Sequence, residues 1–268
     1  RLPFDTSLRV YRAVTPRSDV GFGPPPRPLA VQETLGAETA ISYPLAGAFD
    51  GQSVGASYSV AYTRTQVPAE EERLDPNVTP QLPTSGVLPF VSLGWSYSSA
   101  TRFLWSVAAE HGFSASLNMT ATHPAFGSEA ASLAVSGRAT GYLLMPWLRH
   151  HSLGVSVSGG TSTGRYLGQG PFFIGGFVEP SLFDTLRNLF VQGGIVLRGY
   201  APGSQFGRSY ALTNAEYRFP IVNVDRGLST LPIFLARVTG AAFTDIGAAA
   251  DDLTRASIKV GAGAELWF

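Results

Sequence analysis

The sequence predicts an all-β fold, an antiparallel up-and-down transmembrane β-barrel, and three observations support this. Apolar and polar residues alternate with period 2 along most of the chain. Charged residues make up only 14% of the 268 residues, against roughly 25% in an ordinary soluble domain. Hydrophobic residues reach 44%, yet no apolar run approaches the roughly 18 residues that a membrane helix needs. A barrel wall has this character, because it is apolar only at every second residue.

The composition also excludes several classes of function. The 19 Lys and Arg residues balance the 19 Asp and Glu residues, whereas a nucleic-acid-binding protein would carry a basic excess. The chain has no Cys, which rules out disulfides, zinc–thiolate sites and thiol catalysis. It begins at Arg1 without the signal peptide that export requires, so we expect this N-terminus to be processed or cut.

The alternation is clearest between Phe113 and Thr122, where the odd positions are apolar and the even positions are Ser, Asn or Thr. Several such segments reach the roughly 9–11 residues that a tilted strand needs to cross a bilayer. We expect ten strands, at about 6–15, 36–45, 53–66, 87–99, 112–122, 130–145, 151–163, 208–222, 232–247 and 256–268.

Two further features favour a membrane barrel over a soluble β-sandwich. The polar face consists mostly of Ser, Thr, Gly and Asn, whereas a soluble sandwich usually places charged residues on its wet face. If the strands run alternately down and up, aromatic residues gather at one rim, as in an interfacial girdle. The residues expected at this rim are Tyr97, Phe113, Trp147, Phe219, Phe234 and Phe268.

Three stretches interrupt the alternation. Residues 16–35 are rich in Pro and Gly, and residues 67–86 contain Glu70, Glu71 and Glu72, so both are expected to be loops. Residues 164–207 are far longer than a hairpin turn, and loops of this size are usually functional. Within them, residues 181–190 have apolar residues at helical spacing. This predicts a short helix, which is either a surface cover over the barrel mouth or a lid.

The alternation also places two carboxylates in the lumen on adjacent strands. Glu216 shares a face with Asn214 and Arg218, and Asp245 shares a face with Arg237 and Thr239. An arginine at the tip of an inward-folded loop would be held by such a pair, because its planar fork makes bidentate, charge-assisted bonds. Arg198 in the long loop is the candidate, with Gly199 allowing a sharp turn and Tyr200 packing against the wall. Arg218 and Arg237 would offset the remaining negative charge. The alternative is that Glu216 and Asp245 are unrelated lumen charges solvated by pore water.

The order of motifs carries a family resemblance. Gly175-Gly176 is followed by Arg198-Gly199-Tyr200, then by Asn214-Ala215-Glu216-Tyr217-Arg218-Phe219-Pro220, and then by Phe243-Thr244-Asp245. This order resembles the surface-antigen superfamily of bacterial outer-membrane barrels. That superfamily includes the central barrel of the β-barrel assembly machinery and the transporters of two-partner secretion. In it, the Arg-Gly-aromatic motif forms the tip of the sixth extracellular loop, so the resemblance implies that residues 164–207 form a long loop folded into the barrel.

The resemblance implies a function without enzymatic activity and without a cofactor. It places the chain in the bacterial outer membrane, where it would assist outer-membrane protein insertion or move polypeptide across the membrane. The implied partners are outer-membrane lipid, unfolded outer-membrane or secreted client proteins, and periplasmic accessory modules, with no nucleic acid. The alternative is a passive porin, or a membrane anchor for a fused periplasmic domain.

We expect one domain, residues 1–268, that is a fragment of a larger barrel. The resemblance is good over residues 88–268 and only general over residues 1–87. The family barrel typically has sixteen strands, five of them after the long loop, whereas the alternation here gives three. The ending Gly263–Phe268 resembles an outer-membrane assembly signal and favours a true C-terminus, but the strand count favours a fragment.

Two patterns that might suggest chemistry carry little weight. Gly160-Thr161-Ser162-Thr163-Gly164 matches a nucleophile elbow, but no helix follows the strand, as that motif requires. His150 and His151 lie in a short turn, and nothing indicates that other ligands converge on them as a metal site requires. We therefore expect no catalytic residue and no metal site.

Overall fold

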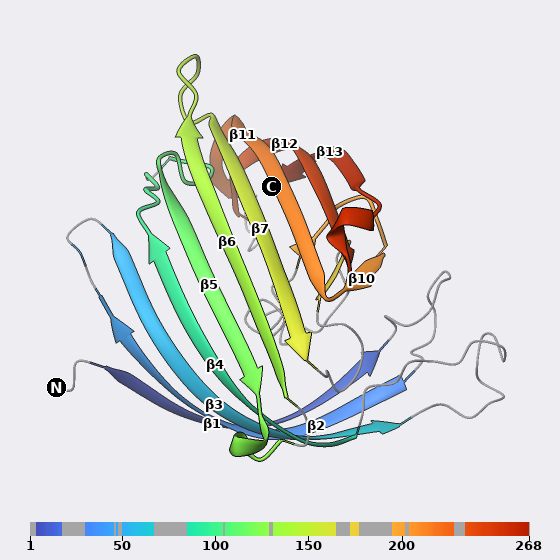
Figure 1. Ribbon diagram of the computed structural model, residues 1–268. Coiled ribbons are helices and arrows are strands. Elements are labelled where there is room, and N and C mark those ends of the chain that lie inside the picture. Colours follow the sequence, from blue (N-terminus) through green and yellow to red (C-terminus); the bar gives the residue numbers. More distant parts are fainter. Residues whose placement is uncertain are drawn as a thin grey trace.

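The main feature of the computed structural model is a curved antiparallel sheet of 10 strands (Figure 1). The structure describes residues 4–17, 30–45, 47, 50–66, 85–103, 105–128, 131–164, 172–176, 195–201, 204–227 and 234–267. The sheet has the order β1-β2-β3-β4-β5-β6-β7-β11-β12-β13, so neighbours in the sheet follow one another along the chain except where the long loop intervenes. This confirms the predicted antiparallel up-and-down connectivity.

The strands correspond to the ten predicted segments, and most boundaries agree within three residues. Their bounds are β1 Asp5–Arg17, β2 Ala30–Pro44, β3 Gly51–Gln66, β4 Gly86–Ser98, β5 Gly112–Thr122, β6 Ser132–Leu144, β7 Ser152–Gly164, β11 Ser209–Gly227, β12 Phe234–Ala250 and β13 Lys259–Trp267. Two 3-10 turns, η2 Pro124–Phe126 and η3 Leu253–Arg255, lie between β5 and β6 and between β12 and β13.

The predicted bounds of the loop at 16–35 are wrong at both ends, because β1 extends to Arg17 and β2 begins at Ala30. The β1–β2 register runs unbroken from Asp5 opposite Ser42 to Arg17 opposite Ala30. The end of β11 was also placed too early, because the strand continues to Gly227 through irregularities after Pro220 and Asn223. Backbone groups make the ladder hydrogen bonds, so pairing can extend beyond the point where side chains stop alternating.

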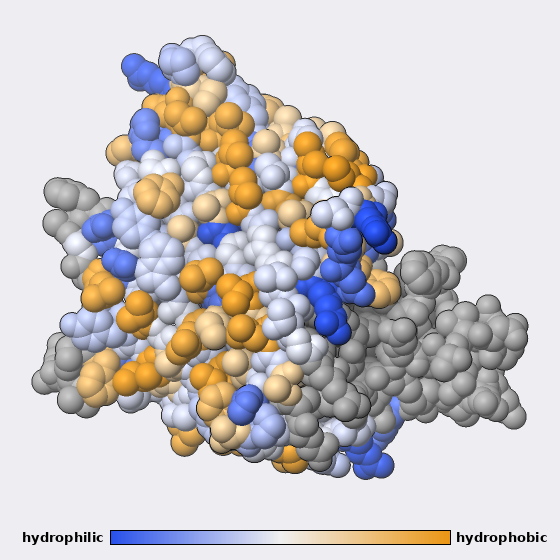
Figure 2. Space-filling model, in the orientation of Figure 1, coloured by the Kyte–Doolittle hydropathy of each residue, from blue (hydrophilic) through white to orange (hydrophobic). Residues whose placement is uncertain are grey.

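The outer face of the sheet is apolar, as the alternation predicted. Leu117 and Val157 are 49% and 55% exposed, Val135 is half-buried, and none of the three lies in a closed interior. Their neighbours of opposite parity on β7, Ser156 and Ser158, are buried on the other face. Figure 2 shows hydrophobic residues spread over much of the face in view. No helix in the described part of the chain is long and apolar enough to cross a membrane.

Aromatic side chains meet at the end of the sheet where β4 ends and β5 begins. The rings of Tyr97 and Phe113 are 4.9 Å apart, and His151 stacks on Phe219 at 5.8 Å. The Trp147 indole donates to the Tyr217 hydroxyl at 3.0 Å. The side chains of Phe234 and Phe268, also expected at this rim, lie outside the described residues.

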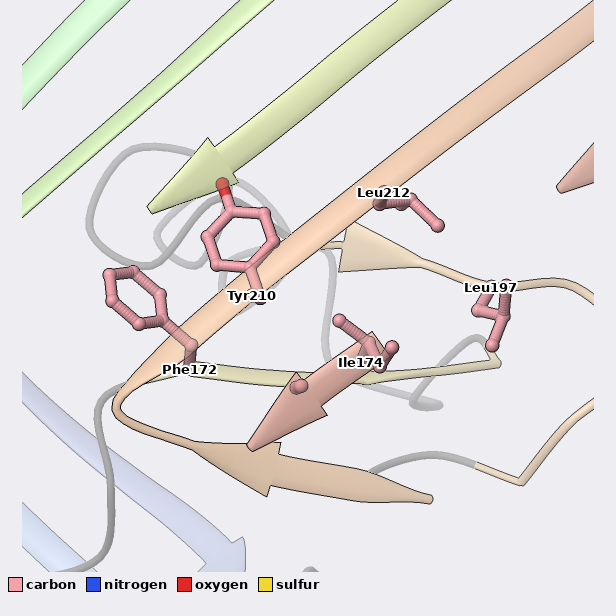
Figure 3. Close-up of a cluster of buried hydrophobic side chains, with 6 residues drawn as sticks. Phe172, Ile174, Leu197, Tyr210 and Leu212 are labelled. Carbon is pink, nitrogen blue, oxygen red and sulfur yellow. The ribbon is translucent and has the colours of Figure 1, made fainter. Parts of the chain in front are cut away.

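The long loop contains a small sheet of its own, which the sequence did not indicate. Its strands are β8 Phe172–Gly175, β9 Ile195–Val196 and β10 Gln205–Gly207; β8 pairs antiparallel with β10 and parallel with β9. This small sheet packs on the lumen face of β11 and β12 through an apolar cluster (Figure 3), which comprises Phe172, Ile174, Leu197, Tyr210, Leu212 and Ala249. The helix predicted at 181–190 lies outside the described residues.

Candidate functional site

The candidate site is centred on Arg198, which follows β9 and reaches the lumen face of the last three strands. Its guanidinium makes a bidentate contact with Asp245 of β12, Nε to Oδ2 and Nη2 to Oδ1, both at 2.8 Å. The backbone N–H of Arg198 donates to the same carboxylate at 3.0 Å. The Asp245 side chain is fully buried and the Arg198 side chain is 12% exposed. This pair therefore combines the fork geometry with shelter from solvent, and both features strengthen a charge-assisted bond.

Two further carboxylates complete the cluster. Nη1 of Arg198 donates to Glu216 of β11 at 3.0 Å and to Glu265 of β13 at 3.1 Å. Arg218 of β11 donates from Nε to the other oxygen of Glu216. We call Arg198 and its three acids, Asp245, Glu216 and Glu265, the latch. The three acids and the two arginines leave one net negative charge at this point of the lumen.

The sheet register explains why these side chains converge. Asp245 lies opposite Asn214 on β11 and opposite Gly261 on β13. The Asn214 amide donates to Asp245 at 2.9 Å and so fixes the orientation of the carboxylate. Gly261 leaves the room that the loop backbone occupies, because a Cβ at this position would lie 2.1 Å from the Arg198 carbonyl oxygen.

Phe243 forms a further part of the Arg198 environment. It lies two residues before Asp245 on β12, and the Arg198 guanidinium sits over its ring with 3.5 Å between the guanidinium carbon and the ring centroid. Stacking of this kind covers one face of the planar cation while its edge remains available for hydrogen bonds. The spacing of Phe243 and Asp245 thus supplies an apolar and an anionic contact to the same arginine.

The loop backbone around Arg198 is shaped by glycines. Gly199 has φ +88°, a left-handed conformation that L side chains rarely adopt. Gly175 pairs with Val196 and accepts a hydrogen bond from Leu197 at 2.7 Å. A Cβ on Gly176 would lie 2.2 Å from the Tyr200 carbonyl oxygen. The Gly175-Gly176 pair therefore allows β8 to pass directly beside the tip of the loop.

Tyr200 fastens the tip to the last strand. Its hydroxyl donates to the Val260 carbonyl at 2.9 Å and accepts from the Val260 amide at 3.2 Å. Lys259 lies over the Tyr200 ring at 4.8 Å. This double contact with the backbone of β13 adds a second attachment, independent of the carboxylates.

The environment of Arg198 keeps it charged. Burial alone would lower the pKa of the guanidinium, but the hydrogen bonds to Asp245, and then those to Glu216 and Glu265, outweigh burial and raise that pKa above its ordinary value. Loss of a proton from Arg198 therefore cannot release the loop at any physiological pH.

The structure brings together all eight residues that the sequence singled out, namely Gly175, Gly176, Arg198, Gly199, Tyr200, Glu216, Phe243 and Asp245. Sequence reasoning missed Glu265 and the steric role of Gly261, although both lie on the polar face of the last segment. Arg237 does not offset the charge of the latch as expected, because it bonds instead to the backbone of residues 105 and 106.

An antiparallel sheet with an apolar outer face, and a loop bound to its polar inner face, is the architecture of a transmembrane β-barrel protein. The chain belongs to the Omp85 superfamily, whose domain model matches residues 31–267. A search of curated proteins finds no match.

The fold is similar to a crystal structure of BamA from Haemophilus ducreyi that lacks POTRA domains 1–3, with a TM-score of 0.61 and 15% sequence identity. The match covers 98% of this chain and 52% of the BamA chain, so the chain spans about half the length of that structure.

Proposed function

We propose that this barrel assists the insertion of outer-membrane proteins, or moves polypeptide across the outer membrane, with the long loop held in the lumen by the latch. The observation that carries the proposal is the attachment of one loop arginine to carboxylates from β11, β12 and β13 at once. Membership of the Omp85 superfamily supports it. Binding polypeptide and lipid requires no covalent step, so the proposal includes no catalytic residue and no cofactor.

The geometry argues against a passive porin. A porin keeps a water-filled channel open along its axis. Here the small sheet of the long loop buries an apolar cluster against β11 and β12 on the lumen side, and Ile174 and Leu197 are fully buried. A loop that is packed by side chains and fastened by charges obstructs passive flow, whereas a polypeptide-handling barrel can move such a loop when a client binds.

The test is reconstitution of the full-length protein into liposomes of outer-membrane lipids. An unfolded small β-barrel client is added, and its heat-modifiable folding and protease protection are followed over time. We expect client folding or protection well above that of empty liposomes, with little swelling in isotonic sugar solutions. Sugar-driven swelling without any effect on the client would establish a porin and overturn the proposal. If the protein neither affects the client nor causes swelling, it acts only as a membrane anchor, and this result would also overturn the proposal.

A further inference from the structure

The loop between β4 and β5, residues 99–103 and 105–111, is folded around a buried acid. Glu110 is 3% exposed and Ser106 is fully buried. The Ser106 hydroxyl donates to Glu110 at 2.7 Å and accepts from the Phe103 amide at 3.0 Å. Thr101 and His111 form a β-bridge that closes the loop at its base. Buried polar groups need partners of this kind, so the loop has a defined shape of its own.

One tie joins this loop to the neighbouring turn. His150, in the turn between β6 and β7, contacts the same Glu110 oxygen through Nδ1 at 2.8 Å. His150 has φ +62°, a left-handed conformation that is uncommon for a residue with a side chain. Burial works to raise the pKa of Glu110, but the hydrogen bonds from Ser106 and His150 outweigh burial and hold that pKa below its ordinary value. The carboxylate is therefore charged at neutral pH and binds the loop to the turn.

A second tie reaches the loop from across the lumen. Arg237 of β12 donates from Nη1 to the carbonyl oxygens of Trp105 at 3.3 Å and Ser106 at 3.2 Å. In the sheet, β12 is separated from β5 by β6, β7 and β11. A residue 131 positions away in the sequence thus holds the loop from the far side of the curved sheet.

The loop also faces the interior of the barrel. A cavity of about 460 Å³ on the lumen side is lined by Ala108 of the loop together with Arg138, Tyr142, Glu216 and Arg218. Glu216 and Arg218 belong to the region of the latch, so this cavity extends from the latch to the loop. The loop borders the cavity at the end of the strands opposite the long loop.

We propose that residues 99–103 and 105–111 form an inner lid that closes this end of the lumen, tied to the β6–β7 turn by Glu110–His150 and to β12 by Arg237. The lid and the long loop then enter one chamber from opposite ends of the strands, and the latch lies between those ends. The proposal rests on the contacts of residues 99–103 and 105–111 and does not depend on whether the barrel handles polypeptide.

The test measures access to the lid in the full-length protein. The chain has no Cys, so Ala108→Cys introduces a single reporter on the lumen side of the lid. The rate at which a membrane-impermeant maleimide labels this cysteine is measured first in the Ala108→Cys variant. It is then measured in a double variant that also carries Arg237→Ala. The matched control is Arg138→Ala, which removes a lumen arginine whose hydrogen bond is to Ser156 rather than to the lid.

We expect labelling of Cys at position 108 to be at least about tenfold faster with Arg237→Ala than without it, because the lid loses the charged-group hydrogen bonds that hold it to β12. Arg138→Ala should leave the rate unchanged. His150→Ala should also accelerate labelling, since it removes the other tie. Equal rates for Arg237→Ala and Arg138→Ala would overturn the lid, and so would fast labelling in the unchanged protein. Circular dichroism of each variant checks that the barrel remains folded.

Discussion

Arg198 binds its partners through a geometry that lysine cannot reproduce. Its planar fork meets Asp245 with two parallel bonds, while a third nitrogen reaches Glu216 and Glu265. A lysine ammonium is a single point charge and would satisfy only part of this set. The site therefore requires arginine at position 198 and not merely a positive charge. Loss of Arg198 would leave the fully buried Asp245 without its cation.

We predict that Arg198→Ala frees the long loop but leaves the barrel folded. A charged-group hydrogen bond contributes about 1.5–3 kcal/mol, so the undocked population should rise by at least about tenfold. Proteinase K should cut between residues 170 and 207 faster in intact cells, with unchanged heat-modifiability on gels. Arg198→Lys should have a smaller effect.

Arg208→Ala is the control for this experiment, because among the described residues only the backbone of Arg208, and not its side chain, contacts an acid. If Arg198→Ala and Asp245→Ala both leave the cutting rate unchanged, Arg198 does not hold the loop.

A second residue-scale prediction concerns pH. The pKa of Glu110 is lower in the folded protein than its ordinary value, so the stability that this carboxylate contributes is fully present above the ordinary carboxyl pKa and is lost as pH falls through the folded value. We expect the melting temperature of the unchanged protein to exceed that of Glu110→Gln at neutral pH, with the difference shrinking as the solution is acidified below about pH 4.5. A difference that stays constant from pH 7 to pH 3 would show that the charge of Glu110 contributes nothing.

At the scale of elements, period 2 made the ten strands predictable. Each strand has an apolar face toward lipid and a polar face toward the lumen. The alternation of apolar and polar residues therefore shows which face each side chain occupies. The same parity rule placed Glu216 and Asp245 in the lumen. The same rule puts Glu265 on the polar face, but it could not show that Glu265 binds Arg198, because that contact exists only when the loop has been positioned against β13. The small sheet β8–β9–β10 could not be predicted from the sequence either, because strands of four residues or fewer show too little alternation to be recognised.

The two faces of one strand give a paired prediction. Leu117→Arg places a charge on the outer face of β5, which should destabilise the barrel by roughly 2–4 kcal/mol near the bilayer midplane. Asn118→Arg, the adjacent residue on the exposed lumen face, should cost far less because water can solvate it. Urea unfolding of both variants in lipid vesicles measures the difference. Equal destabilisation would mean that β5 does not face lipid on the Leu117 side.

At the scale of the whole molecule, the long loop held by the latch and the inner lid enter the same lumen from opposite ends of the strands. When two barriers lie in series, removing one still leaves the other to limit the ion current through the lumen. We predict that Arg198→Ala and Arg237→Ala each raise single-channel conductance in planar bilayers only slightly, and that the double variant raises it by much more than the product of the two single effects. A single variant with the conductance of the double variant would show that only one of the two loops obstructs the lumen.

The distribution of the three carboxylates also has a consequence for assembly. Glu216, Asp245 and Glu265 lie on β11, β12 and β13, which leave the ribosome after the loop that they bind, and Arg198 and Glu265 are separated by 67 positions. Contacts of such long sequence separation form late, because the intervening chain must be ordered before they can stabilise anything. Arg198 therefore gains its full set of partners only when β13 is in register, and a docked loop indicates that β11, β12 and β13 have paired correctly.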